Sequence, residues 1–83
     1  MQRGETAKAQ LAYQELLVLS PKDAQLHNNY ALVLSRKNDP KAVDVASQAQ
    51  ALSPNDPHVN DTLGWLLVNN GEVKRGLTFL RKS

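Results

Sequence analysis

The sequence predicts an all-α fold in which antiparallel helix-turn-helix units stack into a short solenoid. Apolar residues recur along it at helical spacing, and no stretch shows the two-residue alternation of a β-strand. The tripeptide Leu-Ser-Pro occurs at 19–21 and again at 52–54, an offset of 33 residues. A period of this length is typical of repeated helical pairs, because each pair buries its apolar face against the next.

The repeat extends beyond this tripeptide. The same offset of 33 carries the run 30–34 onto the run 63–67, and both runs are mostly apolar. Gly4 returns as Gly71 after 67 residues, which equals one unit of 33 plus one of 34. We therefore expect the middle unit to be one residue short, at the turn formed by residues 38–40.

The first two predicted helices are separated by a proline. The first covers about 5–19, and Pro21 prevents its continuation because proline lacks the N–H that a helix requires. The second covers about 24–37. Asp23 is its expected N-cap, since a carboxylate accepts hydrogen bonds from the free amides of a first turn.

The third and fourth predicted helices cover about 40–52 and about 57–70. Each begins at an Asp-Pro pair, which supplies an N-cap followed by a residue suited to the first turn. Gly71 can adopt the left-handed conformation that ends a helix, and the fifth helix begins near Glu72.

The fourth helix is apolar over six consecutive residues, 63–68. In a stack of helical pairs, the first helix of each pair packs against its own partner and against neighbouring units, so it needs more than one apolar face. We expect Gly76 to lie where two paired helices touch. The predicted core consists of Tyr30, Ala31, Val33, Leu34, Leu63, Gly64, Leu66 and Leu67.

Composition limits the function classes. The chain of 83 residues is predicted to be one domain, and its net charge of +2 comes from scattered basic residues that form no nucleic-acid footprint. It contains no cysteine and no apolar run long enough to cross a membrane, and residues 1–10 lack the apolar core of a signal peptide. If the parent protein is exported, we expect its signal to lie outside this chain. His27 and His58 have no further ligands at metal-binding spacing. We expect no enzyme activity, catalytic residue, metal or cofactor.

The repeat resembles the tetratricopeptide repeat (TPR), a helix-turn-helix unit of 34 residues. His27 and Asn60 stand where the family has an early Trp, and Ala46 stands where an aromatic is usual. The resemblance implies a right-handed superhelical solenoid of about five helices, with a partial repeat at 1–21, a full repeat at 22–54 and a nearly full repeat at 55–83. The matching positions of the third unit are Leu63, Gly64, Leu67, Gly71, Gly76 and Leu80, and Pro21 and Pro54 match the closing proline.

The resemblance also implies a concave groove, lined by the first helix of each unit, that binds a partner peptide or helix. Trp65, flanked by Asp61 and Asn69, is the expected anchor for a peptide. Stacking of Trp65 on a sugar is the alternative, which would make the chain a polysaccharide-binding module. A third interpretation leaves Trp65 covered by the core or by a further helix. The implied groove residues are Gln25, Asn28, Leu32, Ser35, Arg36, His58, Asp61, Trp65, Val68 and Asn69.

The phrases DTLGW and RGLTFLRKS resemble, more narrowly, the C-terminal repeats of long bacterial TPR proteins of exopolysaccharide export and exosortase sorting. This likeness implies a role in a bacterial envelope or secretion assembly, in the periplasm or cell envelope. Without it, we expect a cytoplasmic protein.

The first unit lacks a first helix, so Ala12 and Leu16 should lose the cover that such a helix would give. An uncapped solenoid is expected to be marginally stable or to associate through a terminal face. A homodimer through the uncapped ends is therefore expected beside the protein, peptide or polysaccharide partner.

Overall fold

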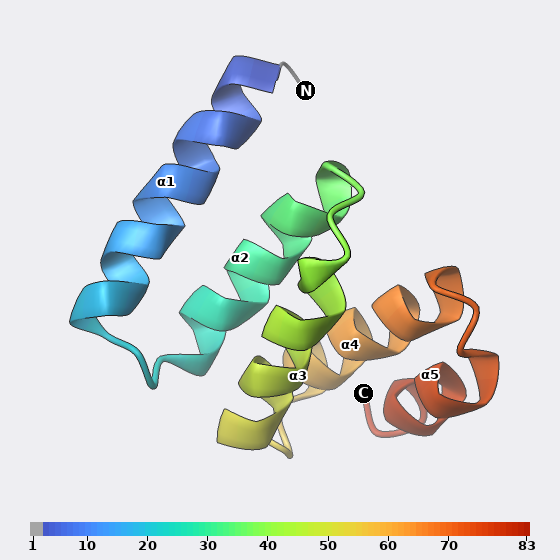
Figure 1. Cartoon of the computed structure of the whole chain (residues 1–83). Helices are drawn as coiled ribbons and strands as arrows, with labels where there is room; N and C mark the ends of the chain where they lie inside the picture. The colour runs from blue at the N-terminus through green and yellow to red at the C-terminus, as the bar shows by residue number, and fades with distance from the viewer. Residues whose placement is uncertain (1–2) are drawn as a thin grey trace.

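The computed structural model describes residues 3–83 and contains five α-helices, with no strand in that range (Figure 1). The predicted all-α fold is confirmed, and the predicted helix boundaries differ from the observed ones by at most two residues. The helices are α1 (Arg3–Leu19), α2 (Ala24–Arg36), α3 (Lys41–Leu52), α4 (Pro57–Asn69) and α5 (Val73–Leu80).

The helices form neighbouring pairs, as in a small helical solenoid. The closest packing joins α2 to α3 and α4 to α5, and α4 also packs against both α2 and α3. Among the described helices, α1 packs against α2 alone. Figure 1 shows α1 at one side of the molecule, with the α4–α5 pair at the opposite side.

The predicted N-caps are present at the starts of α2 and α4. The Asp23 carboxylate accepts a hydrogen bond from the Leu26 N–H at 3.1 Å, and the Asp56 carboxylate accepts one from the His58 N–H at 2.9 Å. Asp39 acts similarly before α3, where its carboxylate accepts from the Lys41 N–H at 2.9 Å. These bonds satisfy amides that would otherwise lack a partner in the first turn.

The turns within the two full pairs close in the same way. Asn38 and Gly71 both adopt positive φ, of 57° and 90°. In each turn, the next residue's N–H donates back to a leucine carbonyl in the preceding helix, Leu34 at 3.0 Å and Leu67 at 2.8 Å. Asn38 therefore does in the second unit what Gly71 does in the third, since asparagine tolerates the left-handed region better than most residues.

The missing residue of the middle unit lies directly after this turn. The Ala42 N–H donates to the Asp39 carbonyl oxygen, three residues back, whereas the Gly76 N–H donates to the Glu72 carbonyl oxygen, four residues back. Both carbonyl groups belong to the residue that closes the turn. The structure therefore agrees with the prediction that one residue is missing near 38–40. It places the missing residue at the first turn of α3.

The turns between pairs are closed by hydrogen bonds from side chains of the helix that follows each turn. His27 Nε2 lies 2.9 Å from the Pro21 carbonyl oxygen, and the Asn60 side-chain amide donates to the Pro54 carbonyl oxygen at 3.0 Å. Because a carbonyl oxygen only accepts, His27 must carry its proton on Nε2. His27 and Asn60 are one repeat apart, so two different residues perform the same task.

The core lies between α2, α3 and α4. Most of the predicted core residues are buried, and Leu34 and Leu67 are 0% exposed. Tyr30 is an exception, because it is only half-buried and its hydroxyl accepts a hydrogen bond from the Gln14 side chain on α1 at 3.1 Å. The central cluster consists of Ala31, Leu34, Ala42, Ala46, Leu63, Leu66 and Leu67.

The outer face of α1 is exposed. Ala12 is exposed and Leu16 is 44% exposed, as expected from the lack of a helix on that side. The inner face of α1 carries buried Thr6 and half-buried Tyr13 and Leu17. Large apolar residues therefore occupy both the inner and the outer side of α1.

Candidate functional site

The predicted groove residues lie on α2 and α4, two first helices that pack against each other. Nine of the ten are exposed or half-buried, and we call these nine the α2–α4 surface. Seven are exposed and two, Ser35 and Val68, are half-buried. The α2–α4 surface consists of Gln25, Leu32, Ser35, Arg36, His58, Asp61, Trp65, Val68 and Asn69.

Asn28 is the predicted groove residue that does not reach this surface. It is 3% exposed, and its side-chain oxygen is buried without a hydrogen-bond partner among the described residues. Its equivalent one repeat later is Asp61, which is exposed. The difference arises because α4 packs on α2, whereas no described helix packs on the corresponding side of α4.

Trp65 and Leu32 are the large exposed apolar residues of the α2–α4 surface. They are one repeat apart, on neighbouring helices, and are 53% and 40% exposed. Trp65 is therefore not covered by the core of residues 3–83. Asp61 and Asn69 lie one helical turn before and after Trp65, and both are exposed. An indole ring framed by polar groups offers a large contact area at low entropic cost when a partner binds.

A depression of about 280 Å³ lies beside this surface, where the C-terminal ends of α2 and α4 meet the turn before α3. It shares Ser35 and Asn69 with the α2–α4 surface. Its walls carry amide and carboxylate groups, and Val43 and Leu66 add apolar surface. Leu66 was predicted as a core residue, whereas the lining residues Asn38, Asp39, Pro40 and Asn70 come from the turns and were not predicted as part of a site. The lining consists of Ser35, Asn38, Asp39, Pro40, Ala42, Val43, Leu66, Asn69 and Asn70.

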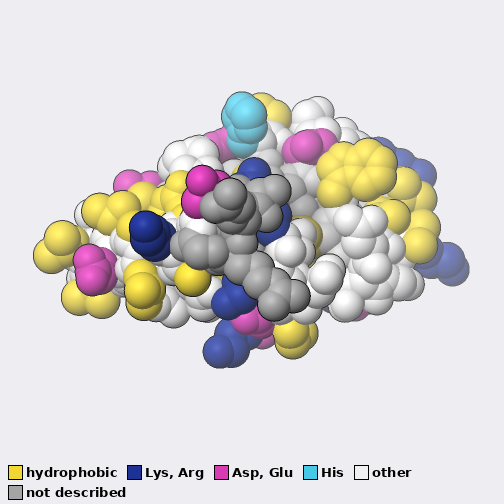
Figure 2. All heavy atoms as spheres, turned by 90° about the horizontal axis from the view of Figure 1, so that it is seen from above, with side chains coloured by type: hydrophobic (Ala, Val, Ile, Leu, Met, Phe, Trp, Pro, Cys, Tyr) yellow, Lys and Arg dark blue, Asp and Glu magenta, His cyan; other side chains and the backbone are white. Residues whose placement is uncertain are grey.

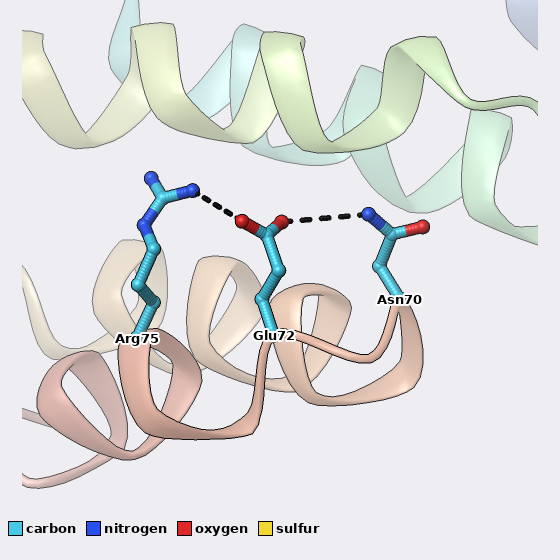
Figure 3. Close-up of polar contacts among 3 residues, drawn as sticks. All are labelled: Asn70, Glu72 and Arg75. Carbon is cyan, nitrogen blue, oxygen red and sulfur yellow. Dashed lines mark hydrogen bonds and ion pairs between the residues drawn. The ribbon is translucent and has the colours of Figure 1, made fainter.

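Glu72 organises the turn at the edge of this depression. Its carboxylate accepts hydrogen bonds from Arg75 Nη1 at 2.7 Å and from the Asn70 side-chain amide at 3.4 Å (Figure 3). The bond from Arg75, followed by the bond from Asn70, holds the pKa of the Glu72 carboxyl below its ordinary value. Asn70, which lines the depression, is therefore oriented by a charged neighbour.

A second depression, of about 530 Å³, lies between α1 and the C-terminal end of α2. It is lined by Thr6, Ala7, Arg36, Lys37 and Asn38. The Lys37 ammonium donates a hydrogen bond to the Gln10 side chain on α1, which links the two helices. Arg36 belongs both to this depression and to the α2–α4 surface, so that surface has a basic edge on the side of α1.

Neither histidine lies in a cluster of metal-ligand type. Within residues 3–83, no group of three or more His, Cys, Asp or Glu side chains is placed to hold a metal ion. His27 is buried against the Pro21 carbonyl group, and His58 is exposed at the start of α4. In the same part of the chain, no helix is both long and apolar enough to cross a bilayer.

No protein-family model matches the sequence, and no curated protein matches it significantly.

Proposed function

We propose that this chain is a non-catalytic scaffold module that binds a segment of a partner protein on the α2–α4 surface. The observation that carries the proposal is the exposure of both Trp65 and Leu32, at equivalent positions of two packed helices. Tryptophan is among the residues that dominate binding energy in protein interfaces. An indole ring that is half in water gains free energy when an apolar side chain of the partner covers it.

We propose further that the helical pairs are TPR units, so that the α2–α4 surface is their concave groove. The resemblance of the sequence supports this assignment, as does the repetition of the pair with equivalent turns at Asn38 and Gly71. The replacement of the family's early Trp by His27 and Asn60 is compatible with it, because both side chains close the turn that precedes their helix.

The chemistry of the surface defines the partner segment. Trp65 and Leu32 call for one or two apolar side chains, and the polar depression at Ser35 and Asn69 can accept backbone groups of an extended chain. Arg36 at one edge favours an acidic residue next to the apolar ones. A short peptide with an apolar centre and an acidic flank fits this pattern.

The test is a titration of a peptide library against the domain, followed by NMR. Peptides that bind should shift the resonances of Trp65, Leu32 and Asn69. Trp65→Ala should abolish binding, and Leu77→Ala is the matched control, because Leu77 is 40% exposed but lies on α5. Equal loss of binding in both variants would show that the binding surface lies elsewhere.

Direct binding of a polysaccharide is the second candidate function. It is favoured by the exposed indole ring of Trp65 between Asp61 and Asn69, since a flat aromatic face stacks on a sugar and polar neighbours bind its hydroxyl groups. Neutral oligosaccharides should be titrated beside the peptides. Shifts at Trp65 with oligosaccharides alone would replace the peptide proposal with this one.

We propose a place in a bacterial envelope or exopolysaccharide assembly on the narrower resemblance of DTLGW and RGLTFLRKS. Fractionation of cells that express the protein tests this assignment. Recovery in the periplasmic or envelope fraction supports it, and recovery in the cytoplasmic fraction contradicts it.

A further inference from the structure

The outer face of α1 carries a concentration of exposed apolar side chains. Four of the nine large hydrophobic residues exposed in the described chain lie on this helix: Leu11, Leu16, Val18 and Leu19, of which Val18 is 81% exposed. Figure 2 shows hydrophobic side chains gathered at the end of the molecule where α1 lies, with acidic and basic side chains among them. A concentration of large exposed apolar side chains on one helix marks an interaction surface.

Two opposite charges lie within this apolar face. Lys8 and Glu15 are seven residues apart, which is two helical turns, and therefore lie on the same side of α1. Both are exposed, and neither has an ion-pair partner among the residues that the structure describes. Leu11 lies between them, one turn from each.

We propose that α1 is a dimerisation surface and that its occupant is α1 of a second copy of this chain, packed antiparallel about a two-fold axis. With the axis between residues 11 and 12, Lys8 lies opposite the partner's Glu15, and the symmetric contact repeats the pair. A parallel, in-register pair would instead place Lys8 opposite the partner's Lys8. The charges therefore select the antiparallel arrangement.

The same register brings the two copies of Leu11 together beside the two-fold axis, so that their apolar side chains are buried at the centre of the contact. α1 is about 25 Å long at 1.5 Å per residue, and one helix pair buries less than the ~800 Å² per partner of a typical stable interface. The dimer should therefore dissociate reversibly on dilution.

Charge reversal tests the pairing directly. Sedimentation equilibrium of the intact chain, from micromolar to millimolar concentration, should show a monomer–dimer equilibrium. Lys8→Glu and Glu15→Lys should each weaken dimerisation roughly tenfold, because each variant creates two like-charge contacts. The double variant should restore the original dissociation constant. Lys74→Glu, on the exposed face of α5, is the matched control and should leave dimerisation unchanged.

Circular dichroism should show unchanged helix content in all four variants, since each altered side chain is exposed. Leu11→Glu should abolish the dimer and leave a folded monomer. A protein that is monomeric at every concentration overturns the proposal. So does a dimer that Lys74→Glu weakens as much as Lys8→Glu, or one that the double variant fails to restore.

Discussion

Gly64 and Gly76 lie face to face where α4 crosses α5. A Cβ atom placed on Gly76 would lie 2.6 Å from the Gly64 carbonyl oxygen and 2.6 Å from Val68 Cγ2. A Cβ atom on Gly64 would in turn lie 2.9 Å from the Gly76 carbonyl oxygen. All of these distances are shorter than van der Waals contact, so the two backbones approach as closely as they do only because both residues lack a side chain.

Replacement of Gly76 by alanine should therefore destabilise the protein. Alanine gains about 1 kcal/mol of helix propensity over glycine, but overpacking against a rigid backbone costs about 1–3 kcal/mol. We expect a net loss of about 1 kcal/mol in the free energy of unfolding, measured by urea denaturation. Thr78→Ala, at an exposed position of α5, gains propensity without a clash and should be neutral or stabilising. A Gly76→Ala protein that is more stable than the parent would contradict the close crossing.

Gly71 should be sensitive for a different reason. Its φ of 90° lies in the left-handed region, and no atom beyond its chain neighbours lies within 4 Å of a Cβ placed on it, so any penalty comes from its own backbone. Gly71→Ala should lower the free energy of unfolding by roughly 1–2 kcal/mol. Gly71→Asn should lower it less, because Asn38 occupies the equivalent turn. Equal losses in the two variants would argue against the equivalence of these turns.

His27 should be replaceable by asparagine but not by an apolar residue of similar size. The His27 side chain satisfies the Pro21 carbonyl group, and Asn60 does the same for Pro54 in the next unit. His27→Leu leaves that carbonyl group without a donor and should destabilise the fold by about 1–3 kcal/mol. His27→Asn should retain a larger part of the stability. Thermal melts of the two variants decide the matter, and a His27→Leu protein as stable as the parent would exclude this role.

Substitutions of Leu67 and Trp65 should affect different properties: Leu67→Ala should lower stability, and Trp65→Ala should abolish binding. Leu67 is 0% exposed in the central cluster, and Leu67→Ala should cost about 2–5 kcal/mol, enough to unfold much of a domain this small. Trp65 is 53% exposed, so Trp65→Ala should leave the melting curve nearly unchanged. The two melting curves are the measurement. If Trp65→Ala melts as early as Leu67→Ala, Trp65 is a structural residue and the proposed anchor is wrong.

The Glu72 carboxyl should titrate below its ordinary pKa, mainly because of Arg75. A carboxyl whose pKa is lower in the folded state stabilises that state at neutral pH, and the contribution is lost as pH falls through the folded pKa. Arg75→Ala should raise the pKa of Glu72 towards the ordinary value, and Asn70→Ala should raise it less. NMR titration of the Glu72 side chain measures both changes, and the reverse ranking would contradict the assigned causes.

Local signals explain why the helices and their caps could be predicted from the sequence. Asp23, Asp56 and Gly71 each act within a few residues of their own position, so their chemistry does not depend on the rest of the chain. Leu67 and the other core residues followed from the repeat, since equivalent positions have equivalent neighbours. These features were confirmed because they depend only on spacing.

The candidate site could be predicted less completely, because its residues depend on which helix has a neighbour. Asn28 and Asp61 are equivalent in the repeat, yet α4 covers the first and no described helix covers the second. The depression beside Asn69 combines two helix ends with a turn, and no periodic pattern marks it. The role of His27 was missed because no periodic pattern links a side chain to the carbonyl group six residues before it.

The single contact of α1 has a consequence for how the molecule opens. Because α1 packs on α2 alone among the described helices, its departure would expose one side of α2 and leave the cluster around Leu34 and Leu67 in place. Backbone amides of α1 should therefore exchange with deuterium through a low-energy partial opening, whereas those of α4 should exchange only when the whole fold unfolds. α1 would then detach and pack again in an equilibrium that is separate from the unfolding of the other helices.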